Sequence, residues 1–199
     1  MGETFTMRPG VRTAAPEDAA AVAELIATAF AQLKVAAYLV PERRERHKIM
    51  TANVQIFVEH AVEHGEVHLV EDGTAAAVWF PRTAPLPEPR DYDRRLVQAT
   101  GSWVDRFRAL DALFEAHHPA EPHHHLAFLA VHPDHQNQGL GSALLRHHHD
   151  RTGGAAAYLE ASSAGSRDLY ARHGYRAREP FALPDGTLFW PMWRPGRAS

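Results

Sequence analysis

Two glycines in a polar turn are the residues of this sequence that most clearly offer chemistry. Residues 129–142 read LAVHPDHQNQGLGS, so an apolar run ends in a polar turn and Gly139 and Gly141 then open a helical segment. The first amides of a helix lack internal partners, and the positive end of the helix dipole lies behind them. Because glycine has no side chain, an anion can approach this backbone closely. The spacing predicts an anion site that suits a pyrophosphate.

Familiar phosphate loops do not account for this turn. It lacks the lysine and hydroxyl ending of G-x-x-x-x-G-K-[ST], and Leu144 stands where G-x-G-x-x-G requires its third glycine. On the glycines alone, an anion site and a glycine-rich helix start with nothing bound remain equal alternatives.

Histidines suggest a second chemistry, metal binding. The chain has 15 of them, with runs at 123–125 and 147–149. Consecutive residues of a helix point about 100° apart, so residues 147–149 cannot all reach one ion. On a strand, only His123 and His125 share a face. We interpret the histidines as solvated or helix-capping side chains and expect no metal site.

The elements that position these residues follow from the apolar periodicity. A spacing near 3.6 residues indicates helices, and short apolar runs between turn residues indicate strands. The order predicts an α/β domain around one twisted sheet. Helices are predicted at residues 16–30, 42–63, 96–114, 139–152 and 166–172, and strands at residues 11–14, 67–70, 75–80, 125–131, 156–161, 175–181 and 187–193.

Composition narrows the class of protein. A chain of 199 residues with 45% hydrophobic and 23% charged residues predicts one folded domain. The net charge of −3 argues against nucleic acid as the main partner. The absence of cysteine excludes disulfides, thiolate metal sites and a cysteine nucleophile. Residues 1–8 lack the core of a signal peptide, and the apolar run 19–30 is too short to cross a membrane. We therefore expect a cytoplasmic protein without membrane partners.

Two segments carry a resemblance to a known family. Residues 136–141, QNQGLG, match the Q/R-x-x-G-x-G/A signature of the GNAT superfamily of acyl-CoA-dependent N-acyltransferases. Residues 159–162, LEAS, followed by residues 169–175, LYARHGY, resemble its second signature, with a Y-x-x-x-G-[FY] ending. The resemblance covers essentially the whole chain. It implies a single domain over residues 1–199 with the α/β (α+β) GNAT fold, a mixed central sheet of six to seven strands flanked by helices on both faces.

The resemblance also implies the donor and the residues that hold it. The donor would be acetyl-CoA, with no metal as cofactor. Gln136 and Asn137 would shape the turn, glutamine replacing the commoner arginine at the first motif position. Ser166 stands where relatives often have an asparagine that holds the coenzyme. The pantetheine arm would pair with the backbone of Leu129, Ala130 and Val131, and the pyrophosphate would rest on the amides of Gln138, Gly139, Leu140, Gly141 and Ser142.

Catalysis would then be direct attack by the substrate amine. The GNAT pattern places the Tyr170 hydroxyl near the thioester sulfur, where a phenol can protonate the departing thiolate. Glu160 is the candidate base, through a water that takes the ammonium proton; a plain pairing with backbone or an arginine is its equal alternative. His125, His132 and Asp134 are weaker candidates.

The acceptor is the least defined component. A resemblance to the puromycin N-acetyltransferases lies in residues 75–79, 121–122, 131, 133–136 and 139–143. It implies that the acceptor is a small-molecule primary amine such as puromycin or a related antibiotic aminonucleoside, and that the protein has a role in antibiotic resistance. We expect a monomer or homodimer. A protein amine or an aminoacyl-tRNA as acceptor, a non-catalytic acyl-CoA-binding module and a histidine-rich metal protein remain alternatives.

The first two helices, the loop 81–89 and the last strand pair would border the acceptor pocket. Candidate aromatic walls, with core packing as the favoured alternative for most of them, are Phe30, Tyr38, Trp79, Tyr92, Trp103 and Trp190.

Overall fold

One mixed sheet organises the molecule. The computed structural model describes residues 10–197, so the segment 1–8 considered above lies outside the described residues. The sheet has eight strands in the order β1-β2-β3-β4-β5-β8-β6, with β7 also pairing with β8, and β4–β5 is its parallel pair. This confirms the mixed α/β class, with one strand more than the upper limit of the six to seven that were predicted. The strands are β1 (Val11–Thr13), β2 (Glu66–Val70), β3 (Ala75–Arg82), β4 (His123–Val131), β5 (Ala157–Ala161), β6 (Arg176–Ala177), β7 (Phe181–Ala182) and β8 (Leu188–Arg194).

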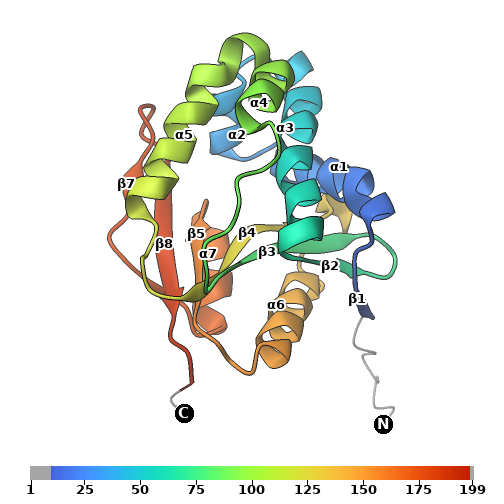
Figure 1. Ribbon diagram of the computed structural model, residues 1–199, viewed down its shortest axis with the longest axis vertical. Coiled ribbons are helices and arrows are strands. Elements are labelled where there is room, and N and C mark those ends of the chain that lie inside the picture. Colours follow the sequence, from blue (N-terminus) through green and yellow to red (C-terminus); the bar gives the residue numbers. More distant parts are fainter. Residues whose placement is uncertain (1–9, 198–199) are drawn as a thin grey trace.

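Helices cover both faces of this sheet, as Figure 1 shows. α1 and α3 pack on one face and α6 and α7 on the other, while α2, α4 and α5 gather beyond one end of the sheet. Within residues 10–197 no helix is both long and apolar enough to cross a bilayer. The helices are α1 (Ala19–Phe30), α2 (Lys34–Leu39), α3 (Arg43–His64), α4 (Tyr92–Thr100), α5 (Val104–His117), α6 (Leu140–Arg151) and α7 (Ala164–Arg172).

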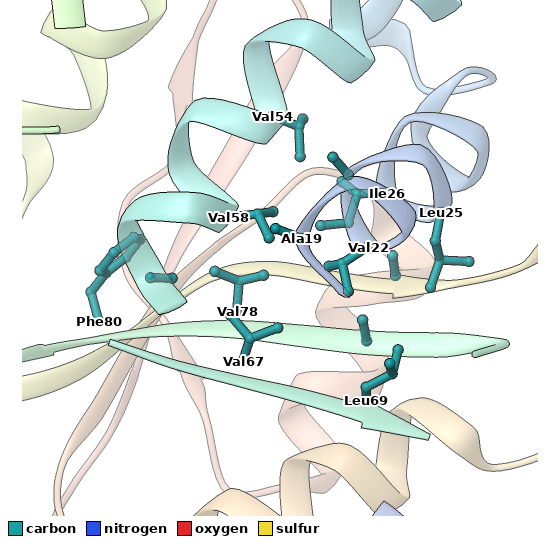
Figure 2. Close-up of a cluster of buried hydrophobic side chains, with 14 residues drawn as sticks. Ala19, Val22, Leu25, Ile26, Val54, Val58, Val67, Leu69, Val78 and Phe80 are labelled. Atoms are coloured by element: carbon teal, nitrogen blue, oxygen red, sulfur yellow. The ribbon is translucent and has the colours of Figure 1, made fainter. Parts of the chain in front are cut away.

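The side chains of β3 alternate between the two faces of the sheet, so this strand contributes to the hydrophobic core on each face. Val78 and Phe80 point to α1 and α3, in the cluster drawn in Figure 2, whereas Ala77 and Trp79 point to α6. Successive strand residues face opposite sides, so one apolar strand serves both layers. Each large apolar side chain buried in this way stabilises the fold by about 1.5–3 kcal/mol.

Two predicted elements differ from the structure, and one helix was not predicted. The helix predicted at residues 96–114 is two helices, because Gly101 has φ of 54° and ends α4. The short helix α2 had not been predicted. The strand predicted at residues 175–181 is interrupted near Pro180, which has no amide hydrogen to donate, and only the short strands β6 and β7 form.

The sheet splits between β4 and β5. These strands pair only at His124–Ala157 and His125–Tyr158, although β4 continues to Val131 and β5 to Ala161. Beside the split, Val78 pairs with Phe128 while Trp79 pairs with Leu126, so β4 carries one extra residue as a bulge. A bulge bends its strand and increases its twist. The half of β4 that ends at Val131 therefore has one edge that does not pair with β5.

Candidate active site

The predicted anion turn is formed at the split end of β4. A short 3-10 turn at Pro133–His135 leads to Gln136, and Asn137 and Gly139 both have positive φ, 61° and 82°. Gly139 is the N-cap of α6, and no side chain caps the helix there. The amides of residues 140–142 therefore have no intrahelical acceptor and are available to an anion. We call residues 139–142 the amide end of the site.

A cavity of about 1270 Å³ begins at the amide end and runs beside the split between β4 and β5. Its walls include most of the residues assigned to the donor from the sequence. Ala130 is not in the wall, because its side chain packs into the core on the α1 side, and neither is Gln138, whose Nε2 donates to the Asp134 carbonyl at 3.4 Å. Those in the wall are Leu129, Val131, Gln136, Asn137, Gly139, Leu140, Gly141, Ser142 and Ser166.

Ser166 lies inside α7 rather than before it. Its amide donates to Ser163 Oγ at 3.1 Å and its own Oγ accepts from the Ser163 amide at 3.1 Å, which forms a capping box. Its hydroxyl is thus already engaged with the helix terminus. A second link joins the two helices of this face, since His173 Nε2 lies 2.9 Å from Ser142 Oγ.

Tyr170 lies in the cavity wall on α7. Only 8% of the residue is exposed, and its ring packs against that of Tyr175. Gly174, with φ of 87°, ends the helix, and the Tyr175 amide returns to the Tyr170 carbonyl at 3.2 Å. This Schellman-type ending explains the Y-x-x-x-G-Y spacing. Burial raises the pKa of the phenol, so it stays protonated at neutral pH, and among residues 10–197 its hydroxyl has no hydrogen-bond partner.

Glu160 pairs with a histidine rather than with backbone or an arginine. Its Oε2 lies 2.9 Å from His125 Nε2, and its side chain is 4% exposed. The other carboxylate oxygen, Oε1, and His125 Nδ1 are buried without partners in the described structure. Both residues line the cavity, so these unsatisfied atoms offer hydrogen-bond acceptors to a bound polar group.

His118 completes this cluster and had not been singled out in the sequence. It enters from the end of α5, and one of its nitrogens lies within 4.8 Å of ligating atoms of His125 and Glu160. Burial, with repulsion from His125, lowers the pKa of His118 to about 3, so it is neutral at pH 7. No sequence spacing signals this grouping, because the three residues come from three elements. His132 and Asp134, the weaker candidates, lie outside the cavity wall and pair with each other at 3.7 Å.

Beyond Glu160 the cavity is lined by aromatic rings. We call this part the aromatic chamber. Phe57 contacts Tyr92 edge-on at 5.7 Å, and the Tyr92 hydroxyl donates to Asp111 at 2.5 Å. Burial raises the pKa of the Tyr92 phenol. Residues 86–89 of the predicted loop also line the cavity. The rings of the chamber belong to Phe30, Phe57, Tyr92, Phe107, Phe114 and Phe189.

Four of the six aromatic walls expected from the sequence lie elsewhere. Trp79 is fully buried on the opposite side of the sheet, stacked on His148 at 3.7 Å. Tyr38 and Trp103 both pack on the guanidinium of Arg106. Trp190 packs on Arg167. Aromatic type alone does not distinguish a core ring from a pocket ring, and of the six only Phe30 and Tyr92 line the cavity.

The interpretation of the histidines as solvated or capping residues is wrong for several of them. His68, His123 and His148 are each at most 1% exposed, and His149 Nε2 lies 3.0 Å from the Tyr175 hydroxyl. Burial, with smaller effects from neighbouring cations, lowers the pKa of His68 to about 4. These rings are neutral core residues at pH 7, which sequence runs of histidine do not reveal.

Comparison with known proteins identifies this arrangement. Residues 104–177, which carry the split strands, the amide end and Tyr170, match the family model of the acetyltransferase (GNAT) domain. This match, together with the structural neighbours, supports an acyl-CoA-dependent N-acetyltransferase. GNAT enzymes use acetyl-CoA as acyl donor, and the cavity offers this donor an uncapped helix start and an unpaired strand edge.

Solved structures show the same fold over nearly the full length. A histone acetyltransferase HPA2 and related acetyltransferase from Corynebacterium glutamicum is 26% identical, with a TM-score of 0.67 over 97% of this chain and 99% of that one. A mosquito arylalkylamine N-acetyltransferase-like protein is 18% identical, with a TM-score of 0.58 over 93% and 98%. The Drosophila melanogaster polyamine N-acetyltransferase is 17% identical, with a TM-score of 0.59 over 92% and 96%. The last two share the GNAT fold.

Proposed function

We propose that this GNAT enzyme transfers the acetyl group of acetyl-CoA to the primary amine of a small molecule with an aromatic or apolar body. The observation that carries the proposal is one continuous cavity, with bare helix amides at one end and aromatic rings at the other. Tyr170 and Glu160 both line this cavity. A donor and an acceptor could therefore meet beside a proton donor and a proton acceptor.

Backbone groups would hold the donor. The amides of residues 139–142 suit a diphosphate, because they combine free N–H groups with the positive end of the α6 dipole. The edge of β4 at residues 129–131 would accept the pantetheine amides as an added strand. Bound acetyl-CoA supplies an activated thioester carbonyl. Because Gln136 replaces an arginine at the first motif position, donor affinity would depend on amides more than on side-chain charge.

Glu160 and His125 would remove the proton of the attacking amine. The free Oε1 of Glu160 is a buried acceptor, and His125 Nε2 at 2.9 Å holds the other carboxylate oxygen in place. Glu160 takes one proton from the ammonium form of the acceptor, directly or through a water, before the nitrogen bonds to the acetyl carbon, and a second proton leaves the nitrogen for solvent as the amide forms. Removal of the first proton makes the nitrogen lone pair available for attack.

Tyr170 would return a proton to the leaving group. When the carbon–sulfur bond breaks, the thiolate takes the phenolic proton, and the phenolate is then reprotonated from solvent. The raised pKa of the buried phenol keeps the proton in place until a strong base such as a thiolate forms nearby. Without a cysteine in the chain, no acyl-enzyme on a thiol can form, which agrees with direct attack.

Puromycin or a related aminonucleoside is the specific acceptor that we propose. The support is the resemblance of residues 75–79 and 139–143 to the puromycin N-acetyltransferases, together with a chamber wide and aromatic enough for a planar base. The buried carboxylates of Asp111 and Glu160 would favour an acceptor that arrives as a cation.

An acceptor screen tests both levels of the proposal. The purified chain is incubated with acetyl-CoA and a panel of puromycin, arylalkylamines, polyamines, a lysine peptide and an N-terminal peptide, and thiol release and acetylated product are measured. We expect the mass gain of one acetyl group on puromycin. Acetylation only of other small amines would overturn the puromycin assignment, acetylation only of peptides would overturn a small-molecule acceptor, and binding of acetyl-CoA without thiol release on any amine would overturn catalysis.

A further inference from the structure

A second cluster of ionisable side chains lies away from the cavity, between β2 and α6. Glu66 and His68 stand two residues apart on β2, so both point to the same face of the sheet. His148 approaches them from α6. His68 and His148 are at most 1% exposed, and the Glu66 side chain is 32% exposed.

The ligating atoms of these three residues converge on one point. Glu66 Oε2 lies 3.2 Å from His68 Nε2 and 3.8 Å from His148 Nδ1, and the two histidine nitrogens lie 3.2 Å apart. Ligands at about 2.0–2.1 Å from a tetrahedral zinc ion are separated by about 3.3 Å. The observed separations fit three corners of such a tetrahedron.

Hydrogen bonds satisfy these atoms only in part, because His68 Nε2 and His148 Nδ1 face each other at 3.2 Å while Glu66 Oε2 has no donor among the described residues. Glu66 Oε2 is buried and accepts no hydrogen bond within the described structure, in spite of its proximity to His68. At most one proton is shared between the two histidine nitrogens that face each other. The nearest fixed cation, Arg151, reaches Glu66 Oε2 only at 3.8 Å and is half exposed.

The surroundings orient His148 as metal-binding histidines are usually oriented. Its other nitrogen, Nε2, lies 3.2 Å from His124 Nδ1, and its ring stacks on the Trp79 indole. An outer hydrogen bond of this kind fixes the tautomer and directs the ligating lone pair. The His147 ring also contacts that of His68 at 4.8 Å and is the nearest candidate for a fourth ligand, with water as the alternative.

We propose that Glu66, His68 and His148 bind one divalent transition-metal ion, with zinc as the favoured ion. Two imidazoles and one carboxylate are a set that zinc accepts in proteins. The ion would tie β2 to α6, the helix whose N-terminal end forms the amide end. The sequence did not predict this site because each histidine run points in several directions, whereas the ligands come from two separate elements. The proposal is independent of the acetyl-transfer reaction.

Zinc titration of the EDTA-dialysed full chain tests this proposal. We expect calorimetry to give one zinc ion per chain and a higher Tm on loading. Glu66→Gln and His68→Gln should each weaken zinc binding by about tenfold or more. The matched control is Glu63→Gln, which neutralises an exposed carboxylate nearby and should leave zinc binding unchanged.

A second control separates this site from the histidine–carboxylate group in the cavity. His118→Gln removes one member of that group and should not affect zinc uptake. Should His68→Gln fail to fold, the near-isosteric Glu66→Gln decides alone, since its side chain is partly exposed. The proposal is overturned if the chain takes up no zinc, if Glu66→Gln binds as tightly as the parent, or if His118→Gln abolishes uptake.

Discussion

The two ends of the cavity offer different groups to a ligand. The amide end offers backbone amides of one turn and one helix, whereas the aromatic chamber offers side chains from α1, α3, α4, α5 and β8. Backbone recognition requires particular residues at fixed spacing, because glycine is needed where φ is positive and where a ligand approaches closely. A chamber lined by side chains needs only suitable bulk at positions that the fold brings together. The two ends should therefore respond differently to substitution.

The largest effect is expected at the point where the two ends meet. Tyr170→Phe removes the proton donor and keeps the packed ring, so kcat should fall about 10²-fold or more while the KM for acetyl-CoA changes little. Steady-state kinetics with the best acceptor measures both. Tyr175→Phe is the matched control, because that hydroxyl bonds His149 outside the site. Equal turnover by Tyr170→Phe and the parent would exclude Tyr170 from the reaction.

Acidification should loosen α6, the helix that carries the amide end. The folded-state pKa of His148, about 2, lies below the ordinary value of 6.5, so the unfolded chain binds more protons below that value. Stability from this histidine is present above pH 6.5 and is lost as the pH falls. Between pH 7 and 5 we expect the free energy of unfolding to decrease by about 2 kcal/mol. Urea titrations in EDTA measure it; a constant value across this range would contradict a neutral buried ring.

Donor binding should be sensitive to bulk at Gly139. Gly139→Val places a side chain at a residue with φ of 82°, so the turn must shift, and the Kd for coenzyme A should rise about tenfold or more. Gly73→Val is a matched control, since Gly73 has φ of 74°, open space around it and no place in the cavity wall. Calorimetry on both variants separates backbone strain from ligand contact. Equal affinities in the two variants would remove the amide end from donor binding.

A substitution in the aromatic chamber should change the KM for the acceptor and leave the KM for acetyl-CoA unchanged. Phe57→Leu removes ring contacts with Tyr92 and Phe128, so the KM for the acceptor should rise about tenfold. The KM for acetyl-CoA should stay constant. If both constants rise together, the two ends are not separate sites.

The smallest effect concerns side-chain charge beside the amide end. Gln136→Arg restores the cation found more commonly at this motif position and should lower the KM for acetyl-CoA by about threefold, with kcat unchanged. The benefit should shrink at high salt. A salt-independent change would indicate that Gln136 acts through the shape of the turn instead.

The sequence located the amide end and Tyr170 because their spacing follows from local backbone geometry. The positive φ of Gly139 and Gly174 marks the start of one helix and the end of another, and both glycines are visible in the sequence. The pairing of Glu160 with His125 and His118 could not be found in this way, because it joins β5, β4 and the end of α5. The sequence likewise could not show that Trp79 is a core residue and that Tyr92 lines the cavity, because this depends on which face of its strand or helix each residue occupies.

A crystal structure of this chain with coenzyme A tests the central claim most directly. The account predicts diphosphate oxygens within hydrogen-bond distance of the amides of residues 139–142, and the sulfur beside the Tyr170 hydroxyl. A coenzyme bound elsewhere on the molecule, or one whose diphosphate leaves those amides to solvent, would contradict it.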